Sequence, residues 1–256
     1  MLNILIPMMG GSFFEGGEYQ YPKPLIEVDS RPLIEHVITC LQSIKQEKRF
    51  IFIINVADAQ KYHLDSVLQL ITPENTIVLQ IARETKGAAC SALLAIEHIN
   101  TNEPLIISNS DHVIDSDLNI AISDFEKQDV DAGLICFDSV HPKWSFVRVD
   151  EHQNVIETAE KRPLSRNAIA GFYYFKHGLD FVEATMRTIE KDASLDGKYY
   201  VAPTLNELVL QNKRIRIHTI HSASYKSFYS PHKIQEYEDF LNLKKQKLIQ
   251  ISAEER

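Results

Sequence analysis

The chain has 256 residues, of which 44% are hydrophobic and 24% are charged, a balance typical of a globular protein with a sizeable buried core. Its formal net charge is −8 and it has no broad basic region, which argues against a nucleic acid or an anionic membrane as a partner. No segment is long and apolar enough to predict a transmembrane helix. Because the first residues also lack a basic leader, we expect a cytoplasmic protein.

The three cysteines of the chain predict free thiols. Cys40, Cys90 and Cys136 are widely separated and stand among apolar residues. An odd number of scattered cysteines in apolar surroundings favours buried thiols over disulfides or a metal site.

The chain begins with a short apolar run at residues 4–6, which predicts a buried strand, and a glycine-rich loop with Gly10 and Gly11 follows directly. Glycines let backbone N–H groups approach a ligand closely and turn toward its oxygens, which is a common way to hold phosphates. Lys23 follows between two prolines that restrict its backbone. The spacing matches neither a P-loop nor a dinucleotide-binding loop.

Strands and helices alternate from here to residue 125. A helix is expected after Ser30, its predicted cap, with Pro32 in its first turn. Further strands are expected at residues 50–56, 76–80 and 104–108, and further helices at 58–70, after Gly87 and at 118–125. Strands separated by helices predict a parallel sheet with right-handed crossovers.

From residue 132 the pattern changes to successive strands. They are expected at residues 132–137 and 168–175, with a hairpin at 144–149 and 154–158 between them. Helices at 179–191 and 202–209, an edge strand at 214–220 and a final amphipathic helix at 231–249 complete the prediction. We therefore expect one α/β domain with a mixed, mainly parallel sheet.

Acidic residues follow the strand predicted at residues 104–108. Asp111 lies just past its carboxyl end, where one or two carboxylates can hold Mg²⁺ against phosphate oxygens. Asp115 and Asp117 spell the D-x-D pattern of many nucleotide-sugar-dependent glycosyltransferases. The same two aspartates can instead cap the helix predicted at 118–125.

The glycine loop and the P-K-P-L motif resemble the signature of the sugar-phosphate nucleotidyltransferases. The matching residues are Gly10, Gly11, Ser12, Pro22, Lys23, Pro24 and Leu25. Enzymes of this family join a nucleoside triphosphate to a sugar phosphate and release pyrophosphate, often for capsule or lipopolysaccharide precursors. The resemblance implies a Rossmann-like, three-layer fold of the GT-A kind. It also implies one domain over residues 1–256, with a nucleotide-binding half (1–130), an acceptor-binding half (131–230) and a C-terminal helix (231–256).

The resemblance also implies site residues. Lys23 and Asp111 are expected to be catalytic, with Asp111 as the Mg²⁺ ligand. Nucleotide contacts are expected from Met9, Gly10, Gly11, Ser12, Gln80, Gly87, Ala88 and Asn109. Acceptor contacts are expected from Glu160, Lys161, Gly171, Tyr200 and Asn206. A carboxylate such as that of Glu160 accepts from hydroxyl groups, and the ammonium of Lys161 is a compact counter-charge for a phosphate.

Two departures from the family pattern leave alternatives open. The glycine loop lacks the usual arginine, and residues 224–230 lack the second metal-binding aspartate that many members carry. One alternative is a cytidylyltransferase for a non-sugar phosphate, such as phosphocholine or an amino-acid phosphate. Another is a regulatory protein that binds a nucleotide-sugar without turning it over, and a third is a glycosyltransferase that uses Asp115 and Asp117. The base, the acceptor and assembly into a homo-oligomer stay open.

Overall fold

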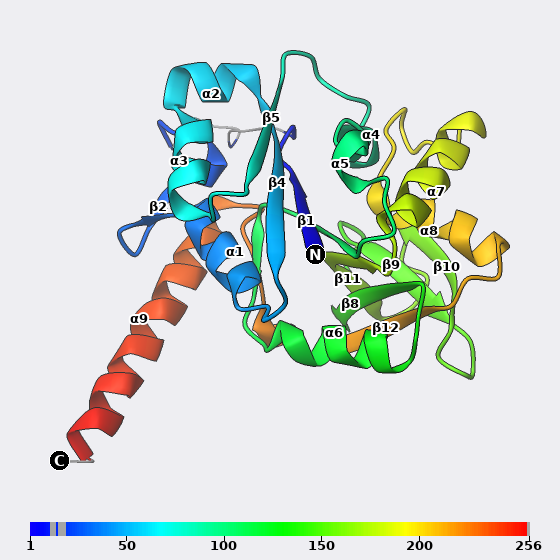
Figure 1. Cartoon of the computed structure of the whole chain (residues 1–256). Helices are drawn as coiled ribbons and strands as arrows, with labels where there is room; N and C mark the ends of the chain where they lie inside the picture. Colours follow the sequence, from blue (N-terminus) through cyan, green and yellow to red (C-terminus); the bar gives the residue numbers. More distant parts are fainter. Residues whose placement is uncertain (11–13, 15–18, 255–256) are drawn as a thin grey trace.

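A computed structural model describes residues 1–10, 14 and 19–254, with side chains described as far as residue 247. In this part of the chain nine strands form a central sheet, and helices cover both of its faces (Figure 1). The strands are β1 (Leu2–Pro7), β4 (Lys48–Asn55), β5 (Ile77–Ile81), β6 (Leu105–Ser108), β8 (Ala132–Asp138), β9 (Ser145–Val149), β10 (Val155–Glu160), β11 (Asn167–Phe175) and β12 (Ile215–Ile220).

The sheet is mixed and mainly parallel. Its order is β10-β9-β11-β6-β1-β4-β5, and β8 pairs with both β11 and β12. The pairs β1–β4, β1–β6, β4–β5 and β8–β12 are parallel, whereas β11 runs antiparallel to β6 and β8. Two small sheets lie beside it, β2 (Glu27–Val28) with β3 (Arg31–Pro32) and β7 (His112–Ile114) with β13 (Tyr225–Ser227).

Helices pack on the two faces of the sheet and give the fold three layers. One layer holds α1 (Leu33–Gln42), α2 (Val56–Tyr62), α3 (Leu64–Ile71), α6 (Leu118–Lys127) and the start of α9 (Pro231–Glu254). The other holds α4 (Ala88–Leu93), α5 (Ile96–Ile99), α7 (Gly178–Glu190) and α8 (Val201–Leu210). Because side chains alternate along a strand, Ile4 and Ile6 pack in the first layer and Leu5 in the second.

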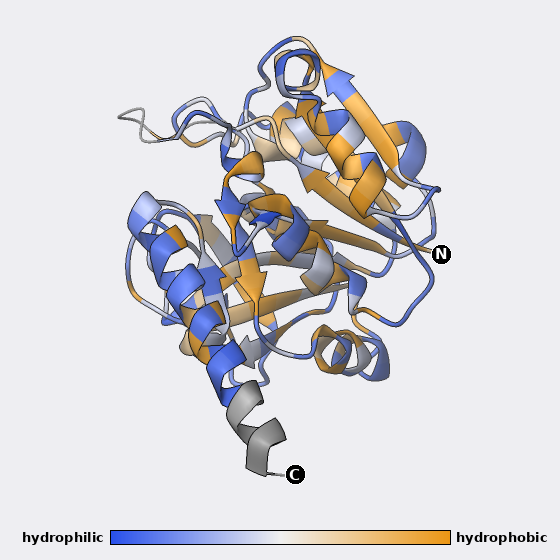
Figure 2. Ribbon diagram, turned by 90° about the vertical axis from the view of Figure 1, so that its left-hand side faces the viewer, coloured by the Kyte–Doolittle hydropathy of each residue, from blue (hydrophilic) through white to orange (hydrophobic). Residues whose placement is uncertain are grey.

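Apolar residues accordingly concentrate in the strands and on the helix sides that face them (Figure 2). The predicted fold class, a three-layer α/β fold with a mixed, mainly parallel sheet, is confirmed. Cys40, Cys90 and Cys136 are free thiols as predicted, but only Cys136 is fully buried, and the other two are partly exposed. None of the helices in the described residues is both long and apolar enough to cross a membrane.

Two local predictions are wrong. Ser30 does not cap α1, because Asp29 and Ser30 both have positive φ, at 51° and 62°, and form the tight turn between β2 and β3. The helix predicted at residues 58–70 is broken at His63, whose left-handed backbone (φ 54°) separates α2 from α3. In α3, Leu70 is 84% exposed, since it lies on the far side of the helix from the buried Leu64 and Leu68.

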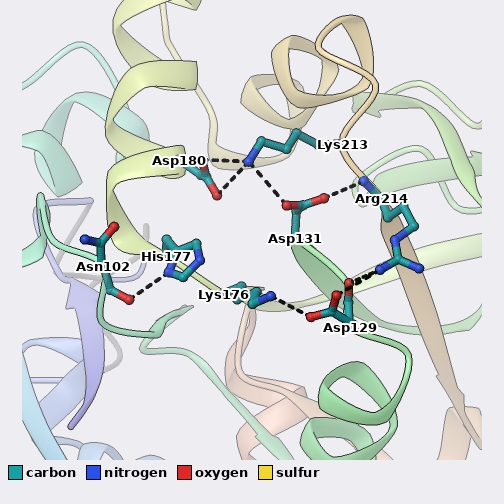
Figure 3. A network of polar contacts seen from close by, with 8 residues as sticks. All are labelled: Asn102, Asp129, Asp131, Lys176, His177, Asp180, Lys213 and Arg214. Carbon is teal, nitrogen blue, oxygen red and sulfur yellow. Dashed lines mark hydrogen bonds and ion pairs between the residues drawn. The ribbon is translucent and has the colours of Figure 1, made fainter.

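A network of charged residues joins the segments around the amino-terminal ends of β8 and β12 (Figure 3). Lys213 lies 3.2 Å from an oxygen of Asp131 and 3.3 Å from an oxygen of the buried Asp180 at the start of α7. The backbone N–H of Arg214 donates to Asp131 at 2.8 Å. These contacts hold α7, β8 and β12 together at the edge of the sheet opposite the carboxyl ends of its parallel strands.

We expect Lys213→Ala to lower the free energy of unfolding by about 1–3 kcal/mol, because it leaves the buried Asp180 carboxylate without its counter-charge. Lys176→Ala is the matched control, since the ion pair of Lys176 with Asp129 is exposed and should contribute little. Urea unfolding measures both variants. An equal loss in the two would contradict a special role for the buried pair.

Candidate active site

A cavity of about 450 Å³ opens beside the carboxyl ends of β1 and β6. In an α/β sheet this edge is where ligands usually bind. The predicted site residues in its wall are Met9, Gly10, Lys23, Gly87, Ala88, Asn109, Asp111 and Tyr200. The structure thus brings together residues from five separate stretches of the chain.

Lys23 and Asp111 line the same cavity. Burial raises the pKa of the Asp111 carboxyl, and the positive charge of Lys23 opposes that rise. Lys23 begins a short 3₁₀ turn, Lys23–Leu25, in which the N–H of Leu25 donates to the carbonyl of Pro22 at 2.8 Å. The Lys23 ammonium also lies 4.5 Å from the ring centre of Phe14. The lysine is therefore held in place by its backbone and by an aromatic ring.

The backbone of Asp111 is fixed by the segment that precedes α9. The N–H of Phe228 donates to the Asp111 carbonyl at 2.8 Å, next to the pairing of β7 with β13. Ser227, directly before Phe228, pairs with His112. The stretch that lacks the family's second aspartate therefore lies beside Asp111.

Gly87 lets two segments approach closely under the cavity. Its φ is +104°, and a Cβ at this position would lie 2.4 Å from the carbonyl oxygen of Tyr199. The N–H of Tyr199 donates to Lys86 at 2.7 Å, and the Tyr199 carbonyl accepts from Ala89 at 3.1 Å. This contact fixes the loop that carries Lys198 and Tyr200 against the start of α4.

Lys198 also lines the cavity, and the sequence interpretation did not include it. The only feature of the sequence that could have indicated Lys198 as a site residue is its position in the same loop as Tyr200, two residues before it. Thr85, likewise missed, lines the cavity, and its hydroxyl lies 2.5 Å from that of Ser91.

Gly171 shapes the other side of the site. It sits with φ +67° where the register of β11 shifts, and its carbonyl accepts from the N–H of Asn109 at 3.0 Å. A Cβ on Gly171 would lie 2.6 Å from the side-chain nitrogen of Asn109 and 3.1 Å from the ring of His112. Only glycine leaves Asn109 in its place at the cavity wall.

His112 packs behind this point as an uncharged ring. Its side chain is buried, and burial lowers the pKa of the imidazole to about 4. Its Nδ1 has no hydrogen-bond partner among the described residues.

Lys161 touches the cavity wall through Tyr200, and Glu160 precedes it at the end of β10. The Lys161 ammonium donates to the Tyr200 hydroxyl at 3.2 Å, and this bond raises the pKa of the lysine. Glu160 accepts a hydrogen bond from the hydroxyl of Ser145, and burial raises the pKa of its carboxyl. The two charges therefore stand next to the cavity wall and not in it.

Besides Glu160 and Lys161, the predicted residues Gln80 and Asn206 do not line this cavity either. Gln80 is exposed on β5, and its side-chain amide donates to Asp65 of α3 at 3.0 Å. The amide of Asn206 accepts from the N–H of Thr158 at 2.8 Å and donates to its carbonyl at 2.9 Å, so it joins α8 to β10. The predictions for Gly11 and Ser12 fall outside the described residues.

Asp115 and Asp117, the two aspartates of the D-x-D pattern, both form contacts that stabilise the fold. Asp117 caps α6 by accepting from the N–H of Asn119 at 2.9 Å, as the cap interpretation predicts. Asp115 forms an ion pair with Lys244 of α9 at 2.9 Å. No group of three or more metal-ligating side chains occurs in the described part of the chain. The arrangement gives the glycosyltransferase alternative no support.

We expect Gly171→Ala to destabilise the protein more than Gly197→Ala. Both glycines have positive φ, at +67° and +70°, so alanine costs about 1–2 kcal/mol of backbone strain at either position. Only Gly171 adds a clash, because nothing lies within 4 Å of a Cβ on Gly197. Urea unfolding compares the two variants. A loss at Gly171 no larger than at Gly197 would show that Asn109 can move away.

The family profile described as nucleotidyl transferase matches residues 19–205, which is more than half of the chain. No curated protein gives a significant sequence match. Among solved structures, the nucleoside-diphosphate-sugar pyrophosphorylase from Vibrio cholerae RC9 is 25% identical, with 93% of this chain and 100% of that chain covered and a TM-score of 0.78.

Two more distant structures share the fold. A UDP-glucose pyrophosphorylase complexed with UDP-glucose is 17% identical, covers 94% of this chain and 98% of its own, and has a TM-score of 0.74. The inositol-1-phosphate CTP transferase from T. maritima is 14% identical, covers 90% of each chain, and has a TM-score of 0.70. Together with the profile match, which spans the P-K-P-L motif, Asp111 and Gly171, these findings confirm the resemblance seen in the sequence: the chain belongs to the nucleotidyl transferase family.

Proposed function

We propose that the protein transfers a nucleotidyl group from a nucleoside triphosphate to a phosphorylated acceptor, with a sugar phosphate as the first candidate. A phosphate oxygen of the acceptor attacks the α-phosphorus, the bond from that phosphorus to the bridging oxygen of the β-phosphate breaks, and pyrophosphate leaves. The observation that carries this proposal is the meeting of Lys23, Asp111 and Gly10 at one cavity. Such transfers need mainly alignment and neutralisation of anions.

Each wall of the cavity has a place in this reaction. The backbone at Met9 and Gly10 approaches the triphosphate, and Lys23 offsets the charge at the α-phosphate. The small residues Gly87 and Ala88 leave a flat surface for the ribose and base. Asn109, placed by its contact with Gly171, donates to the nucleotide.

The acceptor is proposed to lie on the side of Glu160, Lys161 and Tyr200. Lys161 pairs with the acceptor's phosphate, and Glu160 accepts from its hydroxyl groups. Gly171 leaves room for the acceptor ring beside Asn109. Lys198 stands on the same side of the cavity as Tyr200 and adds positive charge there.

The residues at Asp111 fit a magnesium ion. Mg²⁺ commonly takes one or two carboxylates, with water and substrate phosphates as its other ligands, and Asp111 provides one partly buried carboxylate in the cavity wall. When bound, the ion supplies positive charge to phosphate oxygens. Such a site needs no second carboxylate, which agrees with the absence of an aspartate from residues 224–230.

The setting that we propose is the supply of nucleotide-activated precursors for cell-surface polysaccharides, in the cytoplasm. The family resemblance supports the first part, and the three free cysteines agree with a reducing compartment. Cytidylyl transfer to a non-sugar phosphate uses the same residues, and one structural neighbour is named as a CTP transferase for inositol-1-phosphate. A regulatory protein without turnover has little need for Lys23, Asp111 and Lys161 together.

We expect pyrophosphate release from one nucleoside triphosphate with one acceptor when CTP, UTP, dTTP, ATP and GTP are tested with Mg²⁺. The acceptor panel contains sugar phosphates, phosphocholine and amino-acid phosphates. Lys23→Ala and Asp111→Asn should each lower kcat/KM by at least about 100-fold, since the first removes a positive charge that faces the α-phosphate and the second removes the carboxylate that would hold Mg²⁺.

The matched controls are Lys127→Ala at the exposed end of α6 and Asp117→Asn at its cap. Both should keep near wild-type turnover. Loss of activity in Asp117→Asn with a mild effect of Lys23→Ala would instead favour the glycosyltransferase. No pyrophosphate from any pair, with a nucleotide still raising the melting temperature, would favour the regulatory protein.

Lys161→Ala should raise the KM for the acceptor about tenfold or more while the KM for the nucleotide changes little. The reason is that Lys161 does not line the cavity beside Met9 and Gly10 and touches its wall through the Tyr200 hydroxyl, on the side proposed for the acceptor. Steady-state kinetics with each substrate varied in turn measures the two constants. Equal increases in both would contradict the assignment of this lysine to the acceptor.

A further inference from the structure

A second cavity, of about 420 Å³, lies between the loop after β8 and the segment that leads into α9. It shares no lining residue with the first cavity. Its walls combine aromatic rings with lysines. None of these residues takes part in the contacts proposed for the nucleotide or the acceptor.

The aromatic part of this cavity is built around Trp144. Its ring meets Phe137, Tyr225 and Tyr229 edge to face, at centroid distances of 5.6, 5.5 and 5.9 Å. Phe137 and Tyr225 stack on each other at 4.4 Å and form the buried side. Tyr229 is 42% exposed and forms the rim. The cavity therefore offers flat apolar surfaces that reach from the interior to solvent.

The charged part of the cavity is mostly positive. Its lining contains three lysines, Lys143, Lys226 and Lys233, but a single carboxylate, Glu236. Glu236 is already engaged by Lys233 at 2.5 Å, and by His232 at 3.0 Å from outside the lining. The lining thus carries excess positive charge in a chain whose net charge is −8.

Lys143 is the lysine left for a ligand. Its ammonium lies 3.4 Å from the ring centre of Tyr229 and 4.4 Å from that of Trp144. Lys226 by contrast lies 4.1 Å over Phe240 of α9. Within the described residues, Lys143 forms no ion pair with a carboxylate. An ammonium held on two rings without an anion can turn toward an incoming anion and leave the rings free for an apolar group.

We propose that this second cavity binds a small organic anion that carries a planar ring, with its phosphate or carboxylate on Lys143 and its ring against Trp144 and Tyr229. Such a ligand matches both the charge excess and the aromatic walls. Tyr225 begins β13, which pairs with β7, and β7 begins directly after Asp111. A ligand in the second cavity therefore lies close to the candidate active site. The proposal does not depend on the proposed nucleotidyl transfer.

The sequence provides a direct probe of this cavity, since Trp144 is its only tryptophan. Phenyl phosphate is the minimal ligand that combines a ring with a phosphate. We expect it to cause a saturable change in tryptophan fluorescence, excited at a wavelength that tyrosine does not absorb. Inorganic phosphate and phenol, which each lack one half of the ligand, should bind at least about tenfold more weakly.

Variants separate this cavity from the first one. Lys143→Ala should weaken the binding of phenyl phosphate about tenfold or more, whereas Lys143→Arg should keep most of it. Lys23→Ala, Lys161→Ala and the remote Lys127→Ala should leave it unchanged. Isothermal titration calorimetry with the same variants serves as a second readout in case a substitution alters the tryptophan signal itself.

Three results would overturn the proposal. One is a signal abolished by Lys23→Ala or Lys161→Ala, which would place the ligand in the first cavity. Another is a response to choline but not to phenyl phosphate, which would mean that the rings hold a cation in place of Lys143. The third is binding that is the same in Lys143→Ala and wild type. Because fluorescence and calorimetry require no turnover, failure of this proposal is distinguishable from failure of the proposed function.

Discussion

The parallel pairing of β1 with its neighbours β4 and β6 is the constraint on which the rest of the structure depends. Ile4 of β1 lies beside Phe50 of β4 and Ile106 of β6, so the three strands end at one edge of the sheet. Their carboxyl ends lead into the glycine loop, α2 and the Asp111 turn. Segments about 100 residues apart in sequence meet there because strand direction is shared.

Two close contacts at glycines set the exact positions of the segments that meet at this edge of the sheet. Gly87 lets the start of α4 touch the loop at Tyr199, and Gly171 lets β11 touch Asn109. A Cβ at either position would lie more than half an ångström closer to its neighbour than ordinary van der Waals contact allows. Only glycine therefore fits at these two positions without a shift of the neighbouring atoms. The cavity wall is thus defined as much by backbone as by charged side chains.

Much of this arrangement was predictable from sequence, and the exceptions have physical causes. Buried strands, the pinned Lys23 and the position of Asp111 follow from local patterns of apolar residues, proline and turn residues. Gln80 and Asn206 could not be placed in this way, because their partners Asp65 and Thr158 come from other elements. The break at His63 depends on a left-handed backbone that helical periodicity does not reveal.

Lys198 and the second cavity could not be predicted from local sequence patterns either, because both depend on contacts between distant segments. Lys198 has no motif of its own and joins the site only through the contact of Tyr199 with Lys86 and Ala89. Trp144 is about 80 residues from Tyr225 and Tyr229 in sequence, and their ring contacts form only in the folded chain. The composition shows only that the chain has a net negative charge, whereas the structure places lysines next to one another in the walls of the two cavities.

The central claim, transfer of a nucleotidyl group, is tested most directly by following the label from nucleoside triphosphates labelled with ³²P at the α or the γ position. The account predicts that the α label appears in the product formed with the acceptor and that the γ label leaves in pyrophosphate. Transfer of the γ label to the acceptor, or an α label that stays in a free nucleotide throughout, would contradict it.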